Sequence, residues 1–344
     1  MNKTNTGMIL TYSMIHFIID FSCSFLIYQF VYGMDKWYVY LLLYNFCAFA
    51  LQMPIGLLAD KWNHNALCAA IGCGLVALAY GLSGLQIMTV LVVGIGNAMF
   101  HIGGGITVLN VSEKKAGALG VFVSPGALGI YLGTMLGKQE VLVHLIPIIV
   151  LLLAAGILVT LNHHQVNAFV SPNQKVSLEG ATSLKAFIAI SFLFAVVCIR
   201  SYAGMLMKFP WKAEGYWGIA FIGAVVLGKM SGGFLADRIG FRKASILSLG
   251  LAAVLFLFSG YPPTGIIAVF LFNMTMPITL WAAAKIFAGA KGFAFGILTF
   301  GLFLGSLPAL LEIEMTGSIM IALAFASILS ILLMEIGLRR VTEV

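Results

Sequence analysis

Residues 56–61 read GLLADK, and residues 233–238, which lie 177 positions further along the chain, read GFLADR. Two more matches repeat in almost the same register. Asn97 corresponds to Asn273, and KAGALG at 115–120 corresponds to KGFAFG at 291–296, each at a shift of 176 residues. Three matches in one register indicate two related halves. Because six apolar segments separate the copies, we expect both halves to have the same orientation.

The composition predicts that this chain crosses a membrane many times. Of its 344 residues, 61% are hydrophobic and only 9% are charged, against about 45–50% and about 25% in soluble proteins. A helix needs about 20 apolar residues to cross the hydrocarbon core. The continuous apolar runs argue against a β-barrel, whose strands alternate in polarity. We therefore predict an all-α integral membrane protein with twelve spans, at roughly 7–32, 37–59, 66–84, 86–111, 116–137, 141–161, 185–207, 215–235, 244–260, 264–284, 292–311 and 317–338.

The loops indicate the domain organisation and the topology. We expect a six-helix half over 1–161, a polar cytoplasmic linker over 162–184 and a second six-helix half over 185–344. If the N-terminus is cytoplasmic, thirteen of the 19 lysines and arginines lie on the inner side, and four lie outside. This bias predicts cytoplasmic termini in a cell membrane, inner or plasma. It explains the net charge of +7 through the anionic inner leaflet and not through nucleic-acid binding.

The repeated loop identifies a resemblance to a known family. Residues 233–243 read GFLADRIGFRK, which resembles the loop signature of the major facilitator superfamily after its second and eighth helices. Four short motifs are similar to the fosmidomycin-resistance branch of that superfamily: HFIID at 16–20, AMFH at 98–101, SPGALG at 124–129 and CIRSY at 198–202. The resemblance implies the major facilitator fold. It also implies efflux of a small organic compound in exchange for protons.

The two copies of the loop are candidate gates. A carboxylate can accept hydrogen bonds from the free N–H groups at a helix N-terminus. We expect Asp60 and Asp237 to hold helices of the opposite half in this way; the alternative is a tight turn followed by positive-inside residues. The candidate gating residues are Gly56, Asp60, Lys61, Gly233, Asp237, Arg238, Gly240 and Arg242.

Ionisable side chains inside the spans are candidates for the transport site, because each is costly in lipid. Asp20 lies about 20 Å into the first span and Arg200 about 22 Å into the seventh, so the two are expected to face each other at one depth. Asp20 would carry a proton and Arg200 would bind an anion. The alternative is a static ion pair that orders the bundle. The candidate substrate and proton site comprises Asp20, Arg200, His16, His101, Asn97, Asn273, Tyr202 and Lys229.

Several alternatives stay open at this point. His16 and His101 are rival proton carriers because imidazole titrates near neutral pH; a membrane histidine can also simply bond a neighbouring helix. Lys229 can extend to the inner interface. His16, Asp20 and His101 also suit a divalent metal, so a metal-ion carrier is the alternative function. A membrane enzyme is less favoured, since no nucleophile and base lie at one depth.

The expected partners are a small anionic or zwitterionic substrate, protons and the lipid bilayer. We expect a monomer. No phosphate-binding loop occurs in the sequence, and no cofactor is expected. The five cysteines all lie in apolar runs without a CxxC motif, which argues against a disulfide framework. Pro125 and Pro277 predict kinks in the fifth and tenth spans.

Overall fold

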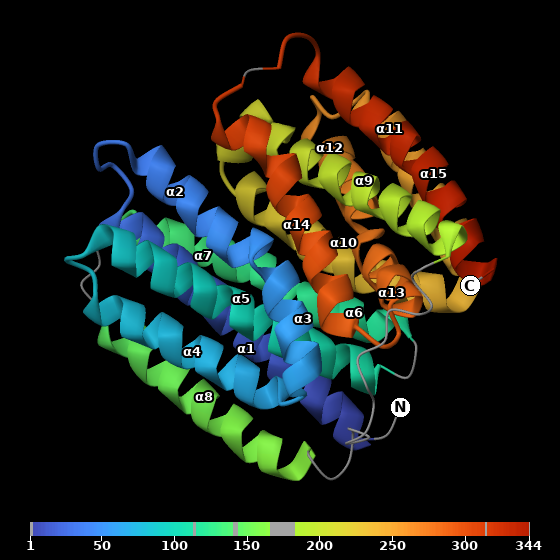
Figure 1. The fold of residues 1–344 in the computed structure, drawn as a ribbon. Helices are drawn as coiled ribbons and strands as arrows, with labels where there is room; N and C mark the ends of the chain where they lie inside the picture. The colour runs from blue at the N-terminus through green and yellow to red at the C-terminus, as the bar shows by residue number, and fades with distance from the viewer. Residues whose placement is uncertain (1–2, 113–114, 140–143, 166–182, 314, 344) are drawn as a thin grey trace. The chain divides into compact units, whose positions relative to one another are not determined.

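The computed structural model describes residues 3–112, 115–139, 144–165, 183–313 and 315–343, and every regular element in those ranges is helical (Figure 1). In chain order these elements are α1 (Lys3–Phe30), α2 (Trp37–Asn45), a π-helical turn (Phe46–Ala50), α3 (Gln52–Trp62), α4 (Asn65–Gly81), α5 (Gln86–Val111), α6 (Ala116–Val123), α7 (Pro125–Gly137), α8 (Leu145–Gln165), α9 (Leu184–Leu206), a 3-10 turn (Pro210–Ala213), α10 (Trp217–Ile239), α11 (Phe241–Phe256), α12 (Pro262–Asn273), α13 (Met276–Ile286), α14 (Lys291–Leu310) and α15 (Ile319–Glu343).

These elements confirm the predicted all-α membrane protein with twelve spans. In the described part of the chain, nine single or joined helices are long and apolar enough to cross a membrane. Two shorter apolar helices, Asn65–Gly81 and Leu145–Leu161, and the 16-residue α11 complete the twelve. The protein is therefore a multi-pass membrane protein.

The chain divides into two compact units. The first comprises Met1–Glu113, Pro125–Ser177 and Gly289–Phe300; the second comprises Lys114–Ser124, Leu178–Ala288 and Gly301–Val344. Each unit thus contains one short segment from the other half of the sequence. The predicted halves 1–161 and 185–344 stay a prediction. Most of the predicted linker, residues 166–182, lies outside the described residues, while α8 continues to Gln165.

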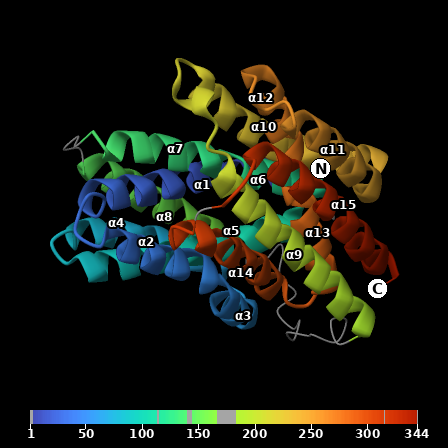
Figure 2. The same cartoon turned by 90° about the horizontal axis from the view of Figure 1, so that it is seen from above.

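In the first unit a glycine stripe brings α7 against the backbone of α1. Both views show these helices side by side (Figures 1 and 2). A Cβ at Gly129 would lie 2.5 Å from the Phe17 carbonyl oxygen, and one at Gly137 would lie 2.7 Å from that of Phe25. In lipid, helices associate largely through such close van der Waals packing. Larger residues at these positions of α7 would therefore separate it from α1.

In the second unit α9 and α15 run alongside each other, and α11 packs against α15 and α12 (Figure 2). Close approach is again made by glycines. A Cβ at Gly228 of α10 would lie 3.1 Å from Cβ of Asn273, and one at Gly305 would lie 2.7 Å from Cβ of Ser201. The Ser201 hydroxyl donates to the Leu302 carbonyl oxygen at 2.6 Å, which fixes the end of α14 on α9.

Three spans are interrupted, each with an identifiable cause. The fifth span breaks between α6 and α7 at Ser124, directly before Pro125, because proline has no N–H and clashes with the preceding turn. The tenth span breaks at Met274 and Thr275, and Pro277 lies in the first turn of α13. These are the two predicted kinks. The π-helical turn Phe46–Ala50 in the second span has no counterpart in the sequence-based prediction.

Candidate functional site

Asp60 and Asp237 bind helix N-termini in the same way. The Asp60 carboxylate accepts the backbone N–H of Gly292 at 2.8 Å and that of Phe293 at 2.9 Å. The Asp237 carboxylate accepts the N–H groups of Ala116 and Gly117, both at 2.9 Å. Each carboxylate therefore satisfies two of the free donors at the start of α14 or α6. We call these two arrangements the latches.

The glycine that opens each motif makes its latch possible. A Cβ at Gly56 would overlap the backbone of Gly292, and a Cβ at Gly233 would lie 2.8 Å from Cα of Gly117. The spacing in GLLAD and GFLAD is thus explained physically: the glycine admits the helix N-terminus, and the aspartate one turn later binds it.

The other candidate gating residues lie around the latches without joining them. Lys61 and Arg238 are exposed. Gly240 has φ +93°, a left-handed conformation that glycine adopts at no steric cost, and it joins α10 to α11. Arg242 pairs with Glu335 of α15, donating from Nε to Oε2 at 2.9 Å, and this pair is partly exposed.

Three titratable side chains meet inside the first unit. His16 and Asp20 come from α1 and His101 comes from α5; their exposed fractions are 5%, 7% and 8%. His16 Nε2 lies 3.1 Å from Asp20 Oδ2 and 2.9 Å from His101 Nε2. His101 Nε2 lies 3.7 Å from Asp20 Oδ1. We call this cluster the triad.

The surroundings of the triad determine which nitrogen carries each proton. His101 Nδ1 lies 2.9 Å from the Asn97 carbonyl oxygen, which only accepts, so Nδ1–H donates to it. The Nε2 atom of a neutral His101 is therefore an acceptor, and the single Nε2–H of a neutral His16 is shared between this atom and Asp20 Oδ2 at 3.1 Å. Asn97 Nδ2 donates to Asp20 Oδ1 at 3.2 Å. One hydrogen-bonded chain thus connects Asn97, Asp20, His16 and His101.

Gly126 closes the triad from the side of α7. An ideal Cβ there would overlap Asp20 Oδ2 and lie 2.5 Å from His16 Nε2. Sequence reasoning placed Gly126 only within the SPGALG motif and missed this contact, because the face of α7 that meets α1 depends on tertiary packing. It also missed Cys23, whose sulfur lies 3.5 Å from Asn97 Nδ2.

Arg200 is a buried cation in the second unit, with an exposed fraction of 8%. Its Nη1 and Nη2 atoms donate to Thr279 Oγ1 at 3.3 and 3.4 Å. The Thr279 hydroxyl in turn donates to the Met276 carbonyl oxygen at 2.9 Å. Among the described residues no carboxylate forms a salt bridge with Arg200. Most of its five donors are therefore available to an anion.

The remaining candidate residues are Asn273, Tyr202 and Lys229. Asn273 Nδ2 donates to the Val269 carbonyl oxygen of its own helix at 2.8 Å. Tyr202 and Lys229 are half-buried. Whether Asp20 faces Arg200 stays a prediction, since the two belong to different units.

The sequence matches no family model and no curated protein. Solved structures do share its fold. The E. coli fucose:proton symporter FucP (N162A) matches with a TM-score of 0.71 and 13% identity, over 97% of this chain and 98% of that one. A second structure, described as the major facilitator superfamily transporter FucP in the outward conformation, matches with a TM-score of 0.66 and 15% identity, over 96% of this chain and 99% of that one.

Both neighbours are named as transporters. These matches do not test the resemblance to the fosmidomycin-resistance branch. At identities of 13% and 15%, the likeness concerns the fold. The chain has the major facilitator fold.

Proposed function

We propose that the chain is a secondary active transporter that moves a small organic anion or zwitterion by alternating access, coupled to protons. The observation that carries this proposal is the triad: three titratable side chains, buried and hydrogen-bonded together within a membrane-spanning unit. Such groups are expensive in lipid and commonly belong to proton relays. The fold of the FucP neighbours supports the same proposal.

The triad provides a place for one transported proton. With Asp20 ionised and both imidazoles neutral, its net charge is −1; one added proton on Asp20 or on a histidine makes it neutral. The Asn97 carbonyl fixes the proton on His101 Nδ1, so the mobile proton is confined to the atoms that face each other, His16 Nε2, His101 Nε2 and the Asp20 oxygens. A change in the packing of α7 at Gly126 would alter these contacts directly.

Arg200 is the proposed anion-binding residue. A buried guanidinium without a carboxylate partner is costly, and a bound carboxylate, phosphate or phosphonate would offset that cost through charge-assisted hydrogen bonds. The Thr279 hydroxyl orients one edge of the guanidinium and leaves other donors for the ligand. Arg200 would bind a zwitterion in the same way, because a zwitterion also presents an anionic group.

The latches are the proposed inner gate. Each is a pair of charge-assisted hydrogen bonds that a conformational change can break as a unit. Two repeat-related latches would open and close together, which is the behaviour that alternating access needs. We further propose that transport is efflux in exchange for protons. The protein is proposed to be a monomer in the inner or plasma membrane, with both termini in the cytoplasm.

The experiment uses the purified protein in vesicles that enclose a pH-sensitive dye. A panel of small organic anions and zwitterions is added outside, and proton movement is recorded. We expect an anionic compound to drive proton flux in the opposite direction to its own. Flux in the same direction would make the protein a symporter and overturn efflux; the absence of proton flux with a transported compound would overturn the coupling.

A divalent metal-ion carrier is the second candidate, and the geometry of the triad favours it specifically. Ligand atoms of His16, Asp20 and His101 lie within 4.8 Å of one another. Tetrahedral zinc with bonds of about 2.0–2.2 Å places its ligands about 3.3 Å apart. The bond from His101 Nδ1 to the Asn97 carbonyl oxygen is a frequent outer contact of metal-binding histidines.

The same vesicles distinguish the two candidates. Loading a metal-sensitive dye and adding Zn²⁺ or Mn²⁺ gives metal influx only if the metal is cargo. Metal flux that is lost in His101→Gln, together with the absence of flux for every organic anion in the panel, would establish the metal carrier and overturn the organic-anion proposal.

A further inference from the structure

A long apolar groove runs between α1 and α8 of the first unit. It consists of two adjoining cavities of about 370 and 390 Å³, which share Ile18 and Val150 in their walls. From Leu10 to Phe25 the groove follows 15 residues of α1, or about 22 Å. That length exceeds one leaflet, which is half of a hydrocarbon core of about 30 Å. We call it the α1–α8 groove.

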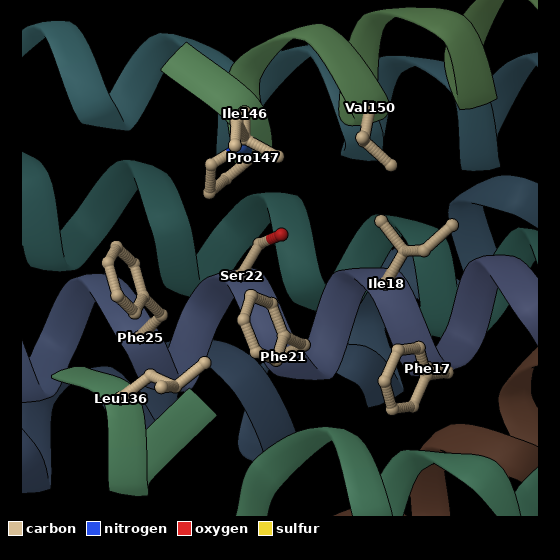
Figure 3. A pocket seen from close by; sticks show the side chains of 9 residues that line it. All are labelled: Phe17, Ile18, Phe21, Ser22, Phe25, Leu136, Ile146, Pro147 and Val150. Carbon is tan, nitrogen blue, oxygen red and sulfur yellow. The ribbon is translucent and has the colours of Figure 1, made fainter. Parts of the chain in front are cut away.

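One hydroxyl in this groove has no partner. Ser22 is 1% exposed, and its Oγ makes no hydrogen bond within the described residues. Two other hydroxyls of α1 bond the carbonyl one turn back: Ser13 donates to Ile9 at 2.6 Å and Thr11 donates to Gly7 at 2.9 Å. Figure 3 shows the Ser22 hydroxyl pointing into the space below Pro147 and Val150 of α8. A buried donor without a partner is destabilising, so a ligand that accepts from it is favoured.

The end of the groove near Ser22 lies toward polar side chains at the start of the α8 span. Ile146 and Pro147 belong to the first turn of α8, so this end lies where the span begins. Beyond it, the Lys138 ammonium lies 5.1 and 4.8 Å from the ring centroids of Tyr28 and Tyr32, as in the aromatic belts of membrane interfaces. His144 Nδ1 is buried there and makes no hydrogen bond with the described residues. The α1–α8 groove thus leads toward the Ser22 hydroxyl, the His144 imidazole and the Lys138 ammonium.

We propose that the α1–α8 groove binds a membrane phospholipid. One acyl chain lies along Ile18 and Val150, its ester carbonyl oxygen accepts the Ser22 hydroxyl, and its phosphate lies toward Lys138 and His144. The apolar walls match the chain, and the Lys138 ammonium matches the phosphate of the headgroup. The bilayer supplies this ligand at high concentration around the protein. The triad faces α5 and α7, so the lipid site is separate from the proposed transport site.

The first test uses the unaltered protein in vesicles of phosphatidylglycerol that carries a diazirine on one acyl chain. After illumination, mass spectrometry maps the labelled peptides. We expect labels to concentrate on 17–25 of α1 and 146–150 of α8. Labels spread over exposed apolar residues outside the groove, such as Leu152 and Leu78, in proportion to their exposure would overturn the proposal.

The second test uses matched variants and native mass spectrometry after detergent extraction. Val150→Trp fills the groove, while Leu152→Trp places the same side chain two residues away, at a position with 55% exposure. We expect the unaltered protein and Leu152→Trp to retain one phosphatidylglycerol and Val150→Trp to lose it. Equal retention by both variants, or capture of detergent or fatty acid in place of phospholipid, would overturn the proposal.

The hydrogen bond to Ser22 is tested with an ether-linked phosphatidylglycerol, which lacks the ester carbonyl. The unaltered protein is expected to prefer the ester lipid by roughly 2- to 10-fold, the range of a single hydrogen bond. Ser22→Ala should bind both lipids equally. An ester preference that persists in Ser22→Ala would overturn the role of Ser22. All three readouts measure binding, so they are independent of whether the protein transports anions, protons or metals.

Discussion

The two halves of the chain agree closely at the latches and differ at their centres. Asp60 and Asp237 each accept two backbone N–H groups at 2.8–2.9 Å. At mid-span, however, a shift of 176 residues relates His101 to Pro277 and Arg200 to Ser24. One half has an acidic, histidine-rich centre, and the other has a buried guanidinium at Arg200. The repeat thus preserves the latch contacts, while the two centres differ in chemistry.

The largest effect is expected from a substitution in the triad, at Asp20. Asp20→Asn keeps the size of the side chain but removes the group that alternates between charged and neutral forms. We expect complete loss of accumulation driven by a pH gradient, with exchange of substrate across the membrane retained. The measurement is pH-driven uptake beside substrate exchange in the same vesicles.

The control for Asp20 is the double variant His16→Gln/His101→Gln. If Asp20→Asn still accumulates substrate uphill while the double variant does not, the transported proton belongs to the histidines. In that case the assignment of Asp20 as the proton carrier is wrong.

The next largest effect is expected from a substitution of Arg200. Arg200→Ala removes a charge-assisted contact to the substrate, which is worth about 1.5–3 kcal/mol, so the apparent substrate constant should rise roughly 10- to 100-fold. The control is Lys212→Ala. Lys212 belongs to the 3-10 turn outside the spans, where its ammonium lies over the Phe221 ring, so its loss should leave this constant unchanged. Transport assays over a range of anion concentrations give both values. An unchanged constant in Arg200→Ala would contradict the anion site.

How much of this arrangement the sequence predicts depends on whether the signal is local. Charged residues and glycines between apolar runs predict the twelve spans, because the cost of burying charge is independent of tertiary structure. The repeated GxxAD spacing predicts the latch contacts, since a helix N-terminus attracts a carboxylate in any context. Thr279 beside Arg200 and Gly126 beside the triad carry no such signal. Their contacts depend on how α13 and α7 are rotated about their axes, which only packing determines.

The same substitution in each latch should lower transport to a similar extent, because the two latches make the same contacts. Asp60→Asn and Asp237→Asn each remove the negative charge from a helix N-terminus, an interaction worth about 0.3–2 kcal/mol in addition to any lost hydrogen bond. We expect each to lower the transport rate by roughly tenfold, with similar effects in the two halves. Asp35→Asn, at an exposed loop position, is the matched control and should transport normally. Normal rates in both latch variants would contradict the gating role.

The smallest expected effect compares two asparagines that the repeat relates. Asn97 is 2% exposed and donates to Asp20, so Asn97→Ala leaves a buried carboxylate with one donor fewer and should cost about 1–3 kcal/mol. Asn273 bonds only the Val269 carbonyl oxygen of its own helix among the contacts that the structure describes, so Asn273→Ala should change stability by about 0.5 kcal/mol or less. Thermal unfolding of the purified variants, followed by intrinsic fluorescence at one pH, measures both. Equal losses would mean that the two asparagines still share one structural role, and the claim that the centres have diverged would fail at this position. A loss confined to Asn97→Ala that disappears in an Asp20→Asn background would show that the asparagine acts through the carboxylate, because a double-variant cycle isolates the energy of that single contact.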